Sequence, residues 1–135
     1  MIPDFKALIE RIGVNEGFRS KPYQCSEGVW TVGHGLTWIT EEESLTILSG
    51  RISDLHLKLS KDLDWYDNMP PEVKGVLIEM VYQIGYSGVM KFKKMIVNMK
   101  DHNWKDAATE MLDSLWAKQT PSRANQLADI VREHG

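Results

Sequence analysis

Residues 72–85, EVKGVLIEMVYQIG, carry apolar side chains on nearly every side of a helix. A helix that is hydrophobic on most of its faces is usually stable only when other elements cover it. The segment therefore predicts a central core helix with the fold built around it. Pro71 suits the first turn, where its missing N–H would have no helical partner in any case. The apolar members are Val73, Val76, Leu77, Met80, Val81 and Ile84.

The N-terminal part of the chain predicts one helix followed by a small β region. Apolar residues at helical spacing predict a helix over residues 3–13, with Asp4 near its start. Its end is expected at Gly13 or, one turn later, at Gly17. Residues 18–38 are rich in glycine and contain the β-favouring run VWTV, which predicts a β-hairpin or a three-stranded sheet.

Helices are expected for most of the remainder. Thr40 and Glu43 match a capping box, and the helix that they open is expected to run to about Leu59. A loop is expected for the run DWYDNMPP. One or two shorter helices are expected for SGVMKFKKMIVNMK, and an amphipathic segment is expected for NWKDAATEMLDSLWAKQ. Thr120 and Pro121 are expected to be the cap and the first residue of a last helix. The layout is α+β, with a β lobe and a helical lobe joined by the helix after Thr40.

Size and charge limit what the chain can do. With 135 residues, 42% of them hydrophobic, it is expected to form one domain with a sizeable core. A net charge of −3 argues against a nucleic-acid binder with a broad basic face, so local contacts must hold any polyanionic substrate. The single cysteine forms no internal disulfide, so the fold does not depend on an oxidising compartment. The first residues, MIPDFKALIERIG, mix apolar and charged side chains, so no signal peptide or membrane anchor is expected there.

A possible catalytic group lies in residues 15–35, NEGFRSKPYQCSEGVWTVGHG. Glu16 stands where the first helix meets the sheet, and apolar neighbours there would raise its pKa enough for general acid catalysis. Cys25 and Thr31 would face it and could together hold or activate a water. Inverting glycoside hydrolysis uses such an acid and an opposing water-activating group, roughly 6.5–9.5 Å apart. Each residue also has an ordinary structural interpretation: Glu16 as a solvated helix end, Cys25 as a small buried thiol and Thr31 as a strand residue. The pattern alone therefore leaves both the catalytic and the structural interpretation open.

The same stretch resembles the active-site segment of the phage-type lysozymes, the endolysins of glycoside hydrolase family 24. Their pattern is Glu, eight residues, Asp or Cys, five residues and Thr, within E-G-x-R-x-x-x-Y-x-[DC]-x-x-G-x-W/Y-T-I-G-x-G. The runs MVYQIGYSGVMKF and SLWAKQTPSRANQL are similar to the family's core-helix and C-terminal blocks, and the resemblance is weakest over residues 39–68. The residues that match the active-site pattern are Glu16, Gly17, Arg19, Tyr23, Cys25, Gly28, Trp30, Thr31, Gly33 and Gly35.

The resemblance implies a lysozyme-like α+β fold in a single catalytic domain, residues 1–135. The β lobe would cover about residues 14–40. The larger helical lobe would cover about residues 60–135 together with the N-terminal helix. The active-site cleft would run between the lobes, with a hinge motion about the connecting helix.

The resemblance also implies roles for individual residues. Glu16 would protonate the leaving glycosidic oxygen, Cys25 would stand where Asp is commoner, and Thr31 would help to hold the attacking water. Arg123 would pair with the catalytic glutamate, lowering the pKa of that carboxyl against the raising effect of burial. Gln83 would line the cleft.

Further residues of the site segment have two interpretations each. His34 is expected either in the cleft or in a structural role, and Trp30 and Trp38 either stack on sugar or pack the small lobe. Cys25 is the main departure from the commoner pattern, because a thiol is mostly uncharged near neutral pH unless a partner lowers its pKa. His56 and His102 lack ligand-like spacing, so no metal is expected.

The implied substrate is bacterial peptidoglycan, cut without a cofactor at the β-1,4 bond from N-acetylmuramic acid to N-acetylglucosamine. We expect a monomer without nucleic acid or stable membrane insertion. It would wait in the host cytoplasm until a holin releases it to the cell wall in the periplasm, unless it is instead part of a virion. The alternatives are a lytic transglycosylase and a non-catalytic peptidoglycan-binding module of the same fold. The water-holding Cys25 and Thr31 favour hydrolysis, and Glu16 argues against a decayed site.

Overall fold

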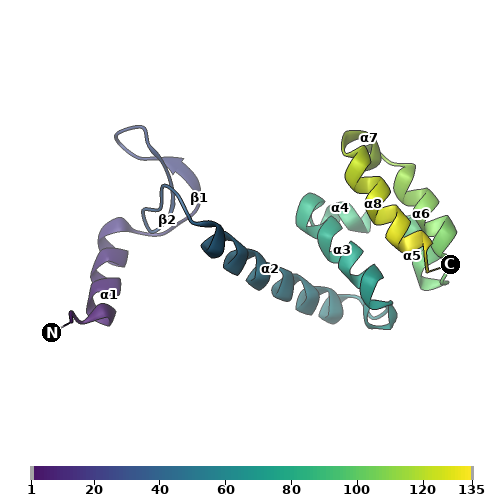
Figure 1. Ribbon diagram of the computed structural model, residues 1–135, viewed down its shortest axis with the longest axis horizontal. Helices are drawn as coiled ribbons and strands as arrows, with labels where there is room; N and C mark the ends of the chain where they lie inside the picture. Colours follow the sequence, from purple (N-terminus) through teal and green to yellow (C-terminus); the bar gives the residue numbers. More distant parts are fainter. Residues whose placement is uncertain (1, 135) are drawn as a thin grey trace. The chain divides into compact units, whose positions relative to one another are not determined.

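The computed structural model describes residues 2–134 and divides the chain into two compact units, residues 1–47 and 48–135. The first unit holds helix α1 (Phe5–Glu16), strands β1 (Arg19–Gln24) and β2 (Trp30–Gly33), and the start of helix α2 (Glu41–Asp62) (Figure 1). The second unit holds the rest of α2 and all later helices. This is the α+β class that the sequence predicts, with a small antiparallel sheet and a larger set of helices.

Helix α1 is closed at both ends by local hydrogen bonds. The Asp4 carboxylate accepts from the backbone N–H of Ala7 at 3.2 Å, which supplies a partner for one of the free donors of the first turn. At the other end Gly17 has a φ of 70°, and its N–H donates to the carbonyl of Gly13 at 2.9 Å. The helix therefore passes Gly13 and ends one turn later, which leaves Glu16 as its last residue.

Strands β1 and β2 form a two-stranded hairpin, the smaller of the two sheets that the sequence allows. Tyr23 lies opposite Thr31 and Gln24 opposite Trp30, and the register shifts between Arg19 and Tyr23. Side chains alternate between the two faces of a strand, so this register places Thr31 and Trp30 on opposite faces.

Helix α2 begins with the predicted capping box. The backbone N–H of Thr40 donates to the Glu43 carboxylate at 2.9 Å, and the N–H of Glu43 donates to the Thr40 hydroxyl at 3.1 Å. The hydrogen bond from the Thr40 N–H is also the main reason that the pKa of Glu43 is lowered. The helix continues to Asp62, slightly beyond the predicted end, and buries Leu59 in the core of the second unit.

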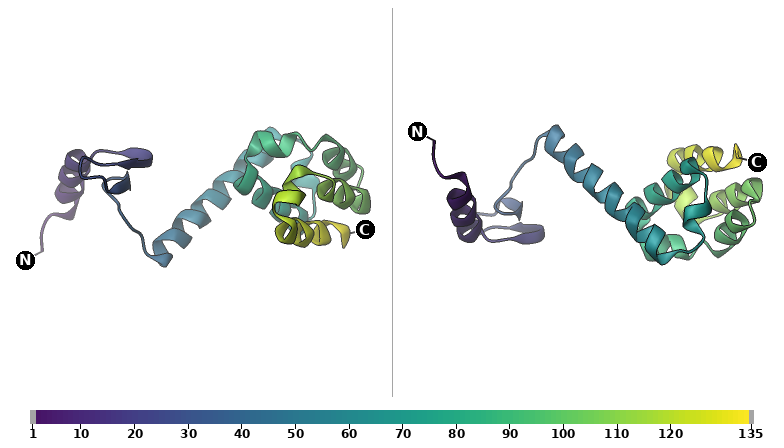
Figure 2. Two further views of the ribbon diagram at one scale, coloured as in Figure 1. Left: turned by 90° about the horizontal axis from the view of Figure 1, so that it is seen from above. Right: turned by 90° about the horizontal axis from the view of Figure 1, so that it is seen from below.

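Both views of Figure 2 show the helices of the second unit packed together beyond the end of α2. Among them, α3 (Pro71–Ile84) contacts α4 (Tyr86–Met90) and α8 (Pro121–Arg132). Helix α3 starts at Pro71 and buries five of its six predicted core residues, while Ile84 is partly buried against the same core. This confirms that the helix belongs to the core, as predicted. The other elements are a 3₁₀ turn (Tyr66–Asn68), α5 (Lys93–Lys100), α6 (Trp104–Leu112) and α7 (Leu115–Gln119).

Two details near the C-terminus differ from the sequence-based expectation. The amphipathic segment over residues 103–119 is broken at Ser114, whose hydroxyl donates to the Met111 carbonyl at 2.7 Å and accepts from the Ala117 N–H at 3.1 Å. Thr120 precedes α8 as predicted, but its hydroxyl donates to the Trp116 carbonyl at 3.0 Å and caps nothing in α8. Thr120 is therefore the N-cap residue of α8 as predicted, and its carbonyl accepts from the Ala124 N–H at 2.9 Å, but its side chain makes no capping hydrogen bond. Within residues 2–134, no helix combines the length and the apolar character needed to cross a membrane.

Candidate active site

The carboxylate of Glu16 lies against the turn that follows β2. Val32 and Leu36 close this turn, because the N–H of each donates to the carbonyl of the other at 2.9 Å. Gly35, inside the turn, has a φ of 74°, and a Cβ built on it would collide with the Glu16 carboxyl group. Gly35 is thus favoured by its backbone conformation, and a larger residue there would push the Glu16 carboxyl group aside. Glu16 lies beside the glycine-rich turn of the site segment as an exposed residue.

Cys25 opens the loop between the two strands. Its N–H donates to the Val29 carbonyl, and its carbonyl accepts from the N–H of Gly28, both at 2.9 Å. Gly28 has a φ of 79°, which fits a three-residue hairpin loop with a glycine in its last position. The sulfur is held beside the backbone N–H of Glu27, and this contact is the largest cause of a lowered pKa for the thiol. The N–H of Val29 lowers the pKa further, so the thiolate forms more readily than in a free cysteine.

Thr31 is brought next to Cys25 by the hairpin. Its side chain is buried, with 7% of the residue exposed, and its hydroxyl donates to the Val29 carbonyl at 3.1 Å. The same hydroxyl is a smaller cause of the lowered pKa of the Cys25 thiol. A hydroxyl has one proton and two lone pairs, so it cannot donate to both partners at the same time. Cys25 and Thr31 thus lie close together, while no hydrogen bond among residues 2–134 joins Glu16 to either, and their joint role in holding a water stays a prediction.

The other two candidates of this segment face different surroundings. The His34 ring lies 5.3 Å from the Phe18 ring and lines a pocket with apolar residues of α1, such as Ile9 and Ile12. Trp30 is 62% exposed and lines a shallow groove of about 230 Å³ that also includes Thr31. Substrate binding by His34 and Trp30 stays a prediction.

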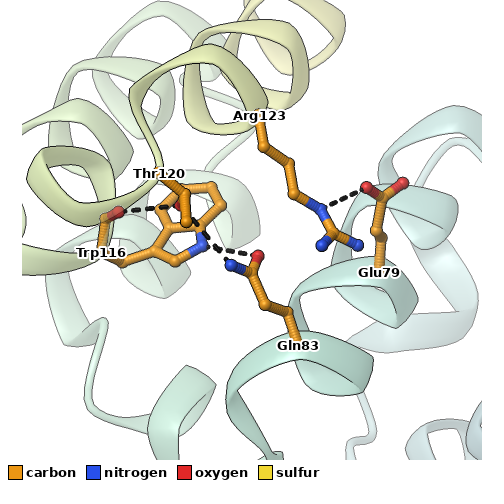
Figure 3. Close-up of polar contacts among 5 residues, drawn as sticks. All are labelled: Glu79, Gln83, Trp116, Thr120 and Arg123. Carbon is orange, nitrogen blue, oxygen red and sulfur yellow. Dashed lines mark hydrogen bonds and ion pairs between the residues drawn. The ribbon is translucent and has the colours of Figure 1, made fainter.

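Gln83, the expected cleft residue of α3, is held by two partners from other helices (Figure 3). Its carbonyl oxygen accepts from the Trp116 indole N–H at 2.9 Å, and its amide nitrogen donates to the Thr120 hydroxyl at 3.5 Å. Thr120 in turn donates to the Trp116 carbonyl. This closed set of hydrogen bonds fixes the start of α8 against α3.

Arg123 forms an ion pair within the second unit. Its Nε donates to the Glu79 carboxylate at 2.8 Å, and both side chains are partly exposed, at 38% and 41% (Figure 3). The expected pairing of Arg123 with the catalytic glutamate stays a prediction. Sequence reasoning missed Glu79 and Trp116. A signal was available for Glu79, which stands four residues before Gln83 in an otherwise apolar helix and so shares a face with it.

Among residues 2–134, no group of three or more histidine, cysteine, aspartate or glutamate side chains is arranged to hold a metal ion. The first unit offers a carboxyl, a thiol with a lowered pKa and a hydroxyl. The second unit, taken by itself, offers a guanidinium whose Nε is bound to a carboxylate. These are acid–base and binding groups, which suit transfer of a glycosyl group to water.

The α+β fold and the comparison with known families define a lysozyme-type glycoside hydrolase. Residues 14–132 match the phage lysozyme family, and the chain belongs to that family. It is similar to two proteins of Dictyostelium discoideum named probable T4-type lysozyme 2 and 1. Each is 27% identical to it, over 92% and 97% of this chain and 92% and 95% of the relative. It also matches the pre-baseplate central spike protein Gp5 of Enterobacteria phage T4, at 26% identity over 93% of this chain but 27% of that protein.

The contact between Gly35 and Glu16 predicts a selective loss of activity in Gly35→Ala. The added methyl group must displace the carboxylate of Glu16, the predicted general acid, and a displacement of about 1 Å can cost roughly 100-fold in rate. Gly85→Ala is the matched control, since Gly85 also has a positive φ but nothing within 4 Å of its Cβ position. Both variants should lose about 1–3 kcal/mol of stability through backbone strain. Cell-wall clearing and thermal unfolding are measured for both variants. Equal clearing activity of folded Gly35→Ala and folded Gly85→Ala would contradict the assigned contact.

The lowered pKa of Cys25 predicts a reactive thiol. The rate of alkylation by iodoacetamide, measured against pH, should reach its half-maximum below the pH found for an ordinary cysteine. The same protein in denaturant provides the control, because the backbone donors of Glu27 and Val29 are then lost and the midpoint should rise. Thr31→Val should raise the midpoint by less than denaturation does, since Thr31 is a smaller cause of the shift. A folded-state midpoint equal to that in denaturant would contradict this account of the site.

Proposed function

We propose that this lysozyme cleaves the β-1,4 bond between N-acetylmuramic acid and N-acetylglucosamine in bacterial peptidoglycan, with Glu16 as the general acid. Peptidoglycan is the substrate that membership of the family implies. The observation that carries the residue assignment is the pairing of Cys25 and Thr31 in the hairpin, with the pKa of the thiol lowered. Glu16 belongs to the same unit, and its carboxyl group lies beside Gly35.

In the proposed reaction, Glu16 gives its proton to the glycosidic oxygen as the bond from that oxygen to the anomeric carbon breaks. A water held by Cys25 and Thr31 attacks the anomeric carbon from the opposite face, and its proton passes to the Cys25 thiolate. The products are two shorter glycans, a Glu16 carboxylate and a Cys25 thiol, and proton exchange with solvent restores the starting state. The lowered thiol pKa supports this role, because only the thiolate can accept the proton.

The biological setting that we propose is host lysis, with the protein held in the host cytoplasm until a holin opens the route to the wall. This rests on the resemblance to endolysins. The match to part of the Gp5 spike protein supports a lysin carried by the virion as the second setting. Expression in a host with and without a holin separates them, since a free endolysin should lyse cells only when the holin is present.

The role of Glu16 predicts that Glu16→Gln abolishes clearing of chloroform-treated Gram-negative cells, because the amide has no proton to donate. The variant is nearly isosteric and should keep the far-UV spectrum and melting temperature of the native protein. Clearing by Glu16→Gln at the native rate would refute the assignment of the acid. Mass spectrometry of products from native protein should show reducing ends, whereas anhydro ends would indicate a lytic transglycosylase.

The role of Cys25 predicts different outcomes for two replacements. Cys25→Ser should lose roughly 100-fold or more in kcat, because a hydroxyl is a far weaker base than a thiolate. Cys25→Asp should keep a good part of the activity, since a carboxylate can also accept the proton of the water. The comparison is made by initial rates on soluble peptidoglycan. Native activity in Cys25→Ser would show that the thiol takes no part in the reaction.

A further inference from the structure

The hydroxyl of Tyr66 is buried and depends on a single partner. Tyr66 lies in the 3₁₀ turn that follows α2, and 0% of its surface is exposed. Its hydroxyl lies 2.8 Å from Nδ1 of His56 on α2, and the two rings are 5.5 Å apart. Among residues 2–134 this hydroxyl makes no other hydrogen bond. Both residues belong to the second unit, so the contact lies wholly inside one unit.

The burial of this hydroxyl decides which of the two groups donates. A buried O–H without an acceptor is costly, and no buried side-chain nitrogen or oxygen of residues 2–134 lacks a partner. Burial, with a smaller effect of the Asp67 charge, raises the pKa of Tyr66, so the phenol keeps its proton. Tyr66 therefore donates to Nδ1, which requires a neutral His56 with its own proton on Nε2.

Protonation of His56 removes this acceptor. Both nitrogens of an imidazolium carry hydrogens, so Nδ1 can then only donate. The tyrosine oxygen can accept that hydrogen, but its own O–H is left without an acceptor among the described residues. A buried donor without a partner weakens the folded state. Because the ordinary pKa of histidine is about 6.5, the change falls between pH 5 and pH 8.

The other charged groups around the pair belong to residue types that ordinarily keep their charges between pH 5 and pH 8. The pH dependence in this range is therefore assigned to His56. These groups are Asp67 in the same turn, Lys74 of α3, whose Nζ lies 5.6 Å from the centre of the Tyr66 ring, and Lys58 and Asp62 of α2, which pair with each other at 2.8 Å.

We propose that His56 and Tyr66 form a pH-sensitive contact that holds the end of α2 to the rest of the second unit. The contact stabilises the second unit above about pH 6.5, and this stabilisation is lost as the pH falls below that value. The buried Leu59 and the hydrogen bond from Ser60 to Asp67, at 2.7 Å, hold the same turns of α2 without a histidine. Acid therefore loosens the end of the helix that joins the two units and does not release it. No catalytic group takes part, so the proposal is independent of the proposed function.

The first test is thermal unfolding of the full chain at several values between pH 5 and pH 8. His56→Asn places a carbonyl oxygen near the position of Nδ1, where it can accept from Tyr66 at every pH because an amide does not titrate. On going from pH 8 to pH 5, the native protein should lose roughly 5 °C more in Tm than His56→Asn, as expected for one buried donor left without a partner. His102→Asn is the matched control. It removes another histidine of the same unit, one that stacks on Trp104, and asparagine suits its positive φ of 58°. This control should keep the native loss in Tm.

The second test is a double-mutant cycle that separates the pair from the other histidines. His56→Ala and Tyr66→Phe are measured singly and together by urea unfolding at pH 8 and at pH 5. The two positions should be coupled at pH 8, where the hydrogen bond is present, and uncoupled at pH 5.

Three results would overturn the proposal. They are an equal loss of Tm in the native protein and His56→Asn, a coupling that is the same at both pH values, and a proton found on Nδ1 of neutral His56. The position of that proton is read at pH 8 from the ¹⁵N chemical shifts of the native protein. This measurement needs no variant, so it decides the proposal even where a substitution prevents folding.

Discussion

Burial of α3 is the interaction on which the second unit depends. Its apolar faces are covered by the helices around it, so the polar residues that it carries must find partners at the edge of the packing. Glu79 and Gln83 do so in different ways, one with a guanidinium and the other with an indole and a hydroxyl. The packing that forms the core therefore also decides where the polar groups emerge. A change in how α8 meets α3 would disturb both sets of contacts together.

The first unit is held by other means. Thr31 is the one buried residue among residues 2–47, so a large apolar core does not fix the candidate catalytic groups there. Backbone hydrogen bonds of the Cys25 loop and of the turn from Val32 to Leu36 take that role. Glycines with positive φ allow both turns, and Gly35 also admits the Glu16 carboxylate. Here the positions of chemical groups follow from the backbone, which explains why the segment is so rich in glycine.

Local signals in the sequence were sufficient for most elements. Pro71 marked the start of α3, Thr40 and Glu43 marked the start of α2, and the apolar residues of α3 indicated burial. The break at Ser114 was not predicted, because the amphipathic spacing continues across it and the serine could equally have stayed within a helix. The ion pair of Glu79 with Arg123 joins residues 44 positions apart, and it depends on the packing of α3 on α8. Sequence spacing carries no information on such a contact.

The charge of the protein gives these local contacts their importance. A net charge of −3 creates no long-range field that would draw the enzyme to an anionic wall. Recognition must then come from short-range groups, and partly desolvated contacts are screened by salt less than exposed charges are. The 16 lysine and arginine residues are outnumbered by 19 acidic residues, so the position of each cation matters more than their number. The contacts between α3 and the start of α8 restrict Gln83 and Arg123, the two residues of the second unit that are predicted to bind substrate, so less freedom would remain to be lost on binding.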